Sequence, residues 1–323
     1  MPTLSSQKKT FMKSNNMFIT ELTRNIEMRG GLFNAHLHLG RSNTLENISD
    51  AHLSLDEKHL RIKDLYKKQA ACKHSIPRIK SCIEELIKFG TKRADTCVDI
   101  FDEIGLDSMK IFTALRDSYR NEIDLRLGPY SPYEISPSTH ELLYESAKEA
   151  DFICSLPDEH KNFTGDIEKT FDIASQFKIS PHFHLDQKNI PKENGTEILC
   201  DVMEAHGVKG AWAVHVISPS SYDEERFFNL VDRLLKNDIG IITCPSGAIS
   251  MYQRREVVAP THNCIARVWE LVNAGVKVKV GSDNTGDMLC PATTLNLLDE
   301  IILLANATRN YNIDDLAKLA TLS

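Results

Sequence analysis

The chain alternates short apolar runs with longer amphipathic stretches. Eight apolar runs are rich in β-branched residues, which is typical of buried strands, and they lie at 31–39, 94–100, 123–127, 151–156, 180–185, 211–217, 239–244 and 276–281. Helical periodicity occurs at 83–89, 138–150, 167–177, 197–206, 224–237 and 264–274. Strands that alternate with helices predict parallel βαβ units. Eight such units predict a closed α/β fold, the (β/α)8 or TIM barrel.

The domain organisation follows from the same alternation. We expect one barrel domain at 26–323, preceded by an N-terminal tail or cap at 1–25, without an appended β-sandwich domain. A doubly wound open sheet is the alternative, but the glycine-rich motifs GxGxxG and GxxxxGK[ST] of nucleotide-binding sheets do not occur. The irregular segment 40–56 follows the first strand. On a barrel it would lie over the C-terminal mouth, where active sites form.

Composition narrows the class of protein. The 323 residues are 41% hydrophobic, enough for a sizeable core, and the net charge of −7 does not favour nucleic-acid binding. No apolar run is long enough to cross a bilayer, and the N-terminus lacks the apolar region of a secretory signal. The eight cysteines are scattered without a CxxC pair, which indicates reduced thiols in the cytoplasm. A homo-oligomer is possible.

Histidines and one aspartate fall at the ends of the predicted strands. His36 and His38 end the first strand, a second His-x-His pair at 182 and 184 ends the fifth, His215 ends the sixth and Asp283 follows the eighth. Alternate residues of a strand share a face, so two imidazoles of one pair can reach one ion. A single strand histidine is more often structural than a ligand. The shared location at strand ends indicates a site, and imidazoles with one carboxylate suit Zn²⁺ or Fe²⁺.

The ordered set His-x-His, His, His, Asp resembles the amidohydrolase superfamily, and more specifically its cytosine deaminase branch and the N-isopropylammelide aminohydrolases of triazine breakdown. The segments Lys88-Phe-Gly-Thr91, Val98-Asp99 and Ile123-Asp-Leu-Arg126 share this resemblance, which extends over 31–321. It implies a mononuclear hydrolase that cleaves a carbon–nitrogen bond of a small nitrogen heterocycle by deamination. One divalent metal ion per chain, Zn²⁺ or Fe²⁺, would be bound by four ligands, His36, His38, His184 and Asp283.

The resemblance also implies catalytic roles. Asp283 would accept a proton from the attacking water, and His215 would hold or polarise that water. The family usually has a glutamate three residues after the fifth-strand histidine, whereas this chain has Gln187, which can position a substrate but cannot shuttle a proton. Proton transfer would then fall to Asp186, His182, His215 or Asp283. We favour His184 over His182 as the ligand because its spacing to Gln187 matches the family's His-x-x-Glu.

Five residues are candidates for substrate contacts: Arg41, Arg126, Asp186, Asn284 and Ser246. Either arginine could bind a carboxylate or a ring carbonyl, although a barrel-rim ion pair is an equally good interpretation. Two alternative functions stay open. The same site could hydrolyse a cyclic or linear amide, or the chain could bind metal without catalysis, since Gln187 and Asn284 replace acids of the family.

Overall fold

The eight predicted strands all form, and they pair in chain order into one parallel sheet. A computed structural model describes residues 16–46, 48–53, 57–58, 60–62, 75–250 and 265–323. Each strand is hydrogen-bonded to the next in parallel, which confirms the predicted barrel. The strands are β1 (Leu32–Leu37), β2 (Thr91–Asp99), β3 (Asp124–Ser131), β4 (Phe152–Ser155), β5 (Ser180–Leu185), β6 (Ala211–His215), β7 (Ile239–Thr243) and β8 (Val278–Val280).

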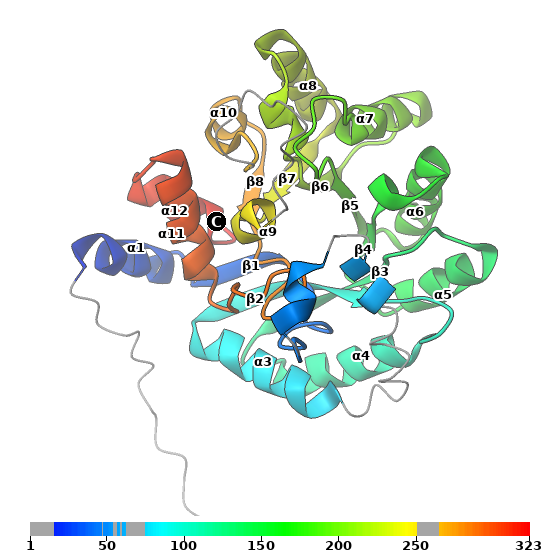
Figure 1. Cartoon of the computed structure of the whole chain (residues 1–323), viewed down its shortest axis with the longest axis horizontal. Helices are drawn as coiled ribbons and strands as arrows, with labels where there is room; N and C mark the ends of the chain where they lie inside the picture. Colours follow the sequence, from blue (N-terminus) through cyan, green and yellow to red (C-terminus); the bar gives the residue numbers. More distant parts are fainter. Residues whose placement is uncertain (1–15, 47, 54–56, 59, 63–74, 251–264) are drawn as a thin grey trace, which may run out of the picture.

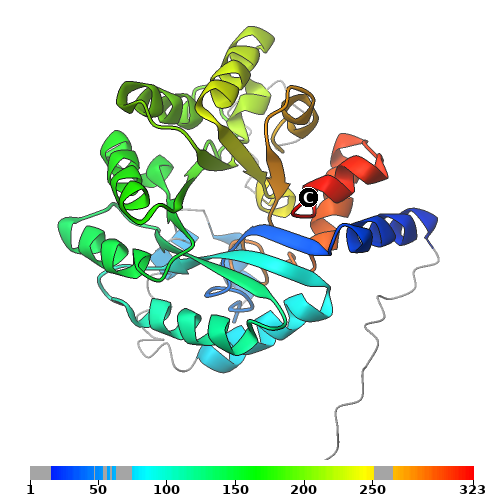
Figure 2. The ribbon, with the colours of Figure 1, turned by 180° about the vertical axis from the view of Figure 1, so that it is seen from behind.

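The helices surround this ring of strands, as the two opposite views show (Figures 1 and 2). The α-helices are α1 (Met17–Met28), α3 (Ile76–Lys88), α4 (Asp107–Tyr119), α5 (Pro137–Ala147), α6 (Phe163–Phe177), α7 (Gly195–His206), α8 (Glu224–Asn237), α9 (Pro245–Ile249), α10 (Val268–Asn273), α11 (Leu297–Thr308) and α12 (Ile313–Leu319). Three short 3₁₀ helices are η1 (Ile48–His52), η3 (Pro157–Glu159) and η4 (Ser218–Ser221). Buried apolar side chains of the strands and the helices pack together into the main core clusters. In the described ranges, every helix falls short of the length and apolarity that a membrane span requires.

The barrel closes where β1 meets the end of β8. The His38 backbone N–H donates to the Asp283 carbonyl at 3.2 Å, and the Asp283 N–H donates to the His36 carbonyl at 3.0 Å. This approach requires a glycine at 281, because a Cβ there would lie 2.6 Å from the His36 carbonyl oxygen. Closure therefore brings two segments some 245 residues apart along the chain into direct contact at the mouth of the barrel.

An irregularity in β1 turns its two histidines inward. Phe33 and Ala35 belong to a small apolar cluster with residues of β6 and β7. Strict alternation would then point residue 36 away from that side. The pairing of β1 with β2 shifts by one residue between Asn34 and Leu37, and His36 and His38 consequently face the same interior as Ala35. Bulges of this kind commonly re-aim side chains next to active sites.

Several element boundaries differ from the prediction. Helix α3 begins at Ile76 instead of residue 83, since a proline in its first turn starts the helix early. Strand β3 runs on to Ser131 through Gly128 and Pro129, two residues that read as breakers in the sequence. Helix α1 begins within the expected tail or cap and packs against α12, and the first 15 residues lie outside the described ranges.

Candidate metal centre and active site

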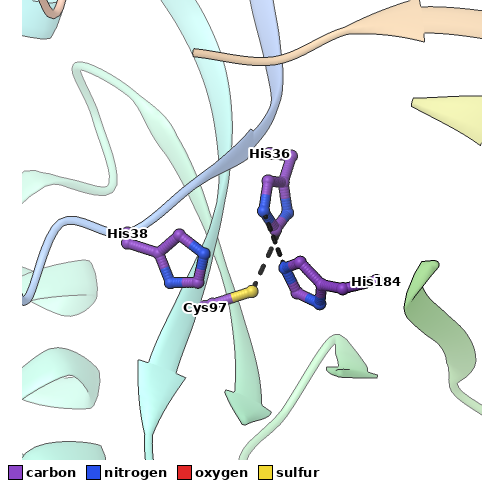
Figure 3. Close-up of side chains that lie close together, drawn as sticks. All are labelled: His36, His38, Cys97 and His184. Carbon is purple, nitrogen blue, oxygen red and sulfur yellow. Dashed lines mark hydrogen bonds between the residues drawn. The ribbon is translucent and has the colours of Figure 1, made fainter. Parts of the chain in front are cut away.

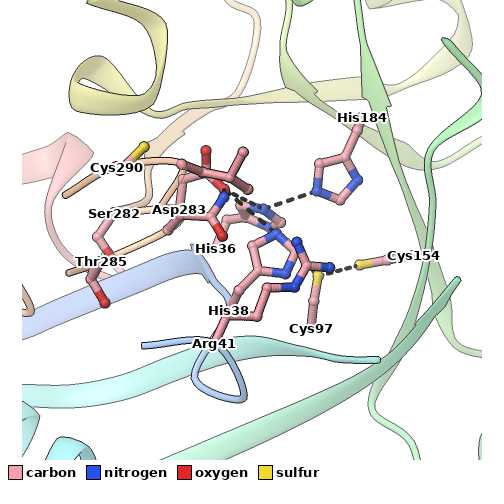
Figure 4. A network of polar contacts seen from close by, with 12 residues as sticks. His36, His38, Arg41, Cys97, Cys154, His184, Ser282, Asp283, Thr285 and Cys290 are labelled. Carbon is pink, nitrogen blue, oxygen red and sulfur yellow. Dashed lines mark hydrogen bonds and ion pairs between the residues drawn. The ribbon is translucent and has the colours of Figure 1, made fainter. Parts of the chain in front are cut away.

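Four histidines and one aspartate converge at the carboxyl ends of the strands. The His36 and His184 Nε2 atoms are 3.0 Å apart, although β1 and β5 lie on different sides of the barrel. The Asp283 Oδ1 atom lies 3.5 Å from His38 Nε2 and 3.7 Å from His36 Nε2. The His215 ring lies 5.5 Å from that of His184, centroid to centroid. Figure 4 shows His36, His38, His184 and Asp283 close together at the interior of the barrel.

The hydrogen bonds of His184 define which of its nitrogens is free. Its Nδ1 atom is 3.0 Å from the Ser155 backbone carbonyl, which only accepts, so Nδ1 carries the proton. The Nε2 lone pair therefore points toward His36. Histidine ligands of metal ions are commonly oriented in this way by a hydrogen bond from the other ring nitrogen.

Burial keeps these imidazoles neutral. Desolvation lowers the pKa of His184 to about 3 and that of His215 to about 4, and it lowers the pKa values of His36 and His38 well below the ordinary value. Burial raises the pKa of Asp283 to about 6. Neutral imidazole is the form that binds metal ions, so the cluster is electrostatically suited to ligation.

Two overlapping groups of these side chains have the spacing of a metal site. One comprises His36, His38, Cys97 and His184, and the other comprises His36, His215 and Asp283, with donor atoms in each group within 4.8 Å of one another. Figure 3 shows the first group, with the Cys97 sulfur on the same side as the three rings. The His38 Nδ1 atom is buried and has no hydrogen-bond partner. Converging neutral donors with an unsatisfied buried nitrogen fit one divalent ion.

The backbone at two of these residues is strained. His215 has a φ of 77° and Asp283 a φ of 59°, in the left-handed region that L-residues seldom adopt. Asp283 is held there by the seam with β1. Strain of this kind clusters at functional sites, where the fold holds side chains that the local sequence would orient differently.

A pocket of about 220 Å³ opens above the cluster. Its lining includes His38, His184, His215 and Asp283, and also the predicted contacts Arg41, Gln187 and Asn284. The buried Arg41 guanidinium donates from Nε to the Asp99 carboxylate at 3.0 Å and lies 5.5 Å above the Tyr130 ring centroid. The Asn284 side chain donates to Asp283 Oδ1 at 2.9 Å, and its own oxygen is buried without a partner. Three residues that the sequence singled out, Arg41, Gln187 and Asn284, thus line this pocket.

Arg126 does not reach this pocket. It lies near the start of β3, at the opposite end of the strand, and its guanidinium donates to Asp124 at 2.8 Å and to Asp151 at 3.0 Å. Its side chain is 41% exposed. In this structure Arg126 makes the barrel-rim ion pair that was the equally good alternative interpretation.

His182 lies one layer deeper in the barrel than His184. Its ring stacks on Phe152 with centroids 4.5 Å apart, and its Nδ1 atom is buried without a partner. It belongs to neither metal-ligand group and does not line the pocket. The geometry therefore favours His184 as the ligand, and it gives His182 no contact with the pocket among the described residues.

Asp186 and Ser246 support local structure beside the pocket. The Asp186 carboxylate accepts hydrogen bonds from the backbone N–H groups of Gly195 and Thr196, at 2.7 and 2.9 Å, and so binds the first turn of α7. The Ser246 N–H donates to Glu300 at 2.8 Å. Neither residue is among the described residues that line the pocket, so their substrate contacts stay predictions.

Sequence reasoning missed Cys97, Tyr130 and Lys58. Cys97 Sγ lies 3.8 Å from His36 Nδ1 and 3.0 Å from Cys154 Sγ. Its alternation with Asp99 on the second strand was the one signal that could have placed it inside. Tyr130 lies in the part of β3 beyond residue 127, where the sequence had predicted the strand to end.

A relative in sequence covers most of this chain. No protein-family model matches the chain. An uncharacterised protein of Haemophilus influenzae is 30% identical over 271 residues, which cover 81% of this chain and 98% of that protein. The chain belongs to the family of this Haemophilus protein. The match thus extends over most of this chain and nearly all of that protein.

Solved structures share the fold. 5-Methylcytosine deaminase of Klebsiella pneumoniae, liganded with 5-fluorocytosine, superposes with a TM-score of 0.79 at 22% identity, covering 88% of this chain and 70% of that one. N-isopropylammelide isopropylaminohydrolase of Burkholderia multivorans has a TM-score of 0.72 at 17% identity, covering 90% and 72%. Guanine deaminase of C. acetobutylicum has a TM-score of 0.60 at 13% identity, covering 91% and 69%. These likenesses show that the chain has the (β/α)8 barrel fold of these enzymes.

Proposed function

We propose that the protein is a mononuclear metal-dependent hydrolase that releases ammonia or an amine from a small nitrogen heterocycle. The observation that carries this proposal is the convergence of His36, His38, His184 and Asp283 beneath a pocket of heterocycle size. These four side chains would hold one Zn²⁺ or Fe²⁺ ion per chain. The deaminases and the aminohydrolase that share the fold act on such rings, which supports the substrate class.

A divalent ion held by these four residues would supply a nucleophile at neutral pH, because it would lower the pKa of a bound water molecule from about 15.7 toward ~7. Asp283 lines the pocket beside His36 and His38 and would take up the proton released by that water. It can return the proton to the leaving nitrogen, which Gln187 cannot do because an amide has no titratable proton. The neutral His215 ring lines the same pocket and donates a hydrogen bond to the developing oxyanion.

The experiment that tests the proposal compares two buried barrel histidines. The purified protein is loaded with Zn²⁺ or Fe²⁺, its metal content is measured, and ammonia or amine release is followed over a panel of aminopyrimidines, aminopurines and aminotriazines. His36→Ala should lose both metal and turnover. The matched control His182→Ala should keep one ion per chain and its turnover, since this histidine lies outside the ligand groups.

Two results would contradict the proposal. Full turnover in His36→Ala would remove the metal site from the reaction. A metal-loaded wild type that releases nothing from any ring on the panel would favour a metal-binding protein without catalysis, or an amide hydrolase if linear or cyclic amides are cleaved instead.

The cellular setting is part of the proposal. The six cysteines in the described ranges are free and buried, which supports a reducing compartment such as the cytoplasm. We propose that the protein acts there on a small molecule and not on nucleic acid or membranes, and that it can form a homo-oligomer. Analytical ultracentrifugation tests the last point.

A further inference from the structure

Lys58 lines the same pocket as the candidate metal centre. It comes from the segment between β1 and α3, shortly after η1, and the neighbouring Ala51 and Leu53 line the same wall. Lys58 is only 9% exposed to solvent. Buried lysines are rare, because removal of an ammonium group from water is costly unless a partner compensates for it.

No such partner is present in the described part of the chain. The structure gives Lys58 no hydrogen bond and no ion pair there, whereas the other pocket cation, Arg41, is held by Asp99 through two nitrogens. Among the described residues, the Lys58 ammonium therefore has no counter-charge at the pocket wall. A fixed, partly desolvated cation of this kind is suited to binding an anion.

The other charges of the pocket do not cancel that of Lys58. Asp283 is the one acid among the described lining residues, and it is engaged by the Asn284 amide and directed at the His36 and His38 rings. Burial lowers the pKa values of His38, His184 and His215 and so keeps these three pocket histidines neutral. A divalent ion at the centre would add further positive charge, so a substrate that brings negative charge would balance the site.

We propose that Lys58 is an anion-binding specificity residue and that the substrate is a nitrogen heterocycle that carries a negative charge, such as a ring carboxylate. This inference rests on the proposed function and names the substrate class of that site. Lys58 binds the acidic substituent, and the ring carbon that loses its nitrogen faces the metal centre. A neutral ring of the same shape binds more weakly because the ammonium group then stays buried without a partner.

The test uses cytosine that carries either a carboxylate or the isosteric carboxamide, at ring position 5 or 6. Titration calorimetry on the metal-loaded protein measures the four dissociation constants, and ammonia release is followed with the same compounds. At one or both ring positions, the wild type should bind the carboxylate at least about tenfold more tightly than the carboxamide. This is the change in dissociation constant that one hydrogen bond between charged groups produces. Lys58→Met should abolish that preference without weakening carboxamide binding, and Lys58→Arg should retain it.

A matched control separates the local contact from the net charge of the protein. Lys80 is an exposed lysine of α3, and Lys80→Met should leave the carboxylate preference of the wild type unchanged. The proposal is overturned if the wild type binds carboxylate and carboxamide alike at both positions, or if Lys58→Met weakens both equally. Ammonia release from carboxamides as fast as from carboxylates would leave the hydrolase standing and remove the anion subsite. Selective carboxylate binding without ammonia release would support the subsite and refute the hydrolase.

Discussion

Gly247 offers a precise way to displace the Asp283 carboxylate without touching the residue itself. Gly247 lies in α9 and lines the pocket, and a Cβ at this position would lie 2.6 Å from Asp283 Oδ2. Ordinary contact begins near 3.4 Å, so in Gly247→Ala the carboxylate must move by almost one ångström. The backbone there is helical and accepts alanine without strain.

The expected effects on stability and on the metal site are different. Alanine in a helix is favourable by up to ~1 kcal/mol relative to glycine, and the close contact costs ~1–3 kcal/mol if nothing moves. Because the contact is with the end of a side chain that can rotate, we expect the free energy of unfolding to change by less than about 1 kcal/mol. Misplacement of a reacting group by ~1 Å costs about 100-fold in rate, so turnover should fall by roughly that factor. Metal affinity should fall at least ~10-fold, since one ligand is displaced.

The assay measures the metal dissociation constant by competition with a chelator and stability by denaturant unfolding. Gly165→Ala is the matched control, because this glycine also lies in a helix, α6, and its added methyl group also meets a polar side chain, that of Asn162. It should leave metal affinity unchanged. Metal binding of Gly247→Ala within twofold of the wild type would refute the reasoning that the position of the Asp283 carboxylate determines the site.

Three further predictions follow from individual contacts. His215→Ala should keep one metal ion per chain by elemental analysis but lose turnover by ~10²–10⁴, the usual contribution of general acid–base catalysis, and a loss of less than tenfold would exclude that role. Arg126→Gln should leave kcat/KM unchanged, because the ion pairs of Arg126 lie at the end of β3 away from the pocket. A clear loss of kcat/KM would show that Arg126 contributes to substrate binding. In the metal-free protein, His182 has a pKa lowered to about 3 by burial. Because this pKa is lower in the folded than in the unfolded protein, the wild type has its full stability above about pH 6.5 and loses stability as the pH falls below that value. From pH 8 to pH 5 the free energy of unfolding of the wild type should therefore fall by ~2 kcal/mol more than that of His182→Leu. Equal losses by denaturant unfolding would refute the shift.

The chain itself determined the architecture. Eight β-branched runs separated by amphipathic helices leave few arrangements that bury both faces of the strands, and a closed parallel barrel is the simplest. The strand-end positions of His36, His38, His184 and Asp283 were readable for the same reason, since parallel strands present all their carboxyl ends at one mouth. Periodicity is a local property, and local patterns predict local structure well.

Contacts across the barrel were decided only by the tertiary structure. For Arg126 the sequence left a substrate contact and a rim ion pair open, because a motif does not say where along a strand the mouth of the barrel begins. In the structure Arg126 lies near the start of β3, away from the mouth. The inward turn of His36 depends on a bulge relative to β2, and Asp283 reaches it only because β8 closes against β1. The position of Lys58 could not be predicted, since nothing in the sequence between β1 and α3 indicates that its side chain lines a cavity. These features depend on residues far apart in the chain, whose approach is set by packing and closure and not by neighbouring residues.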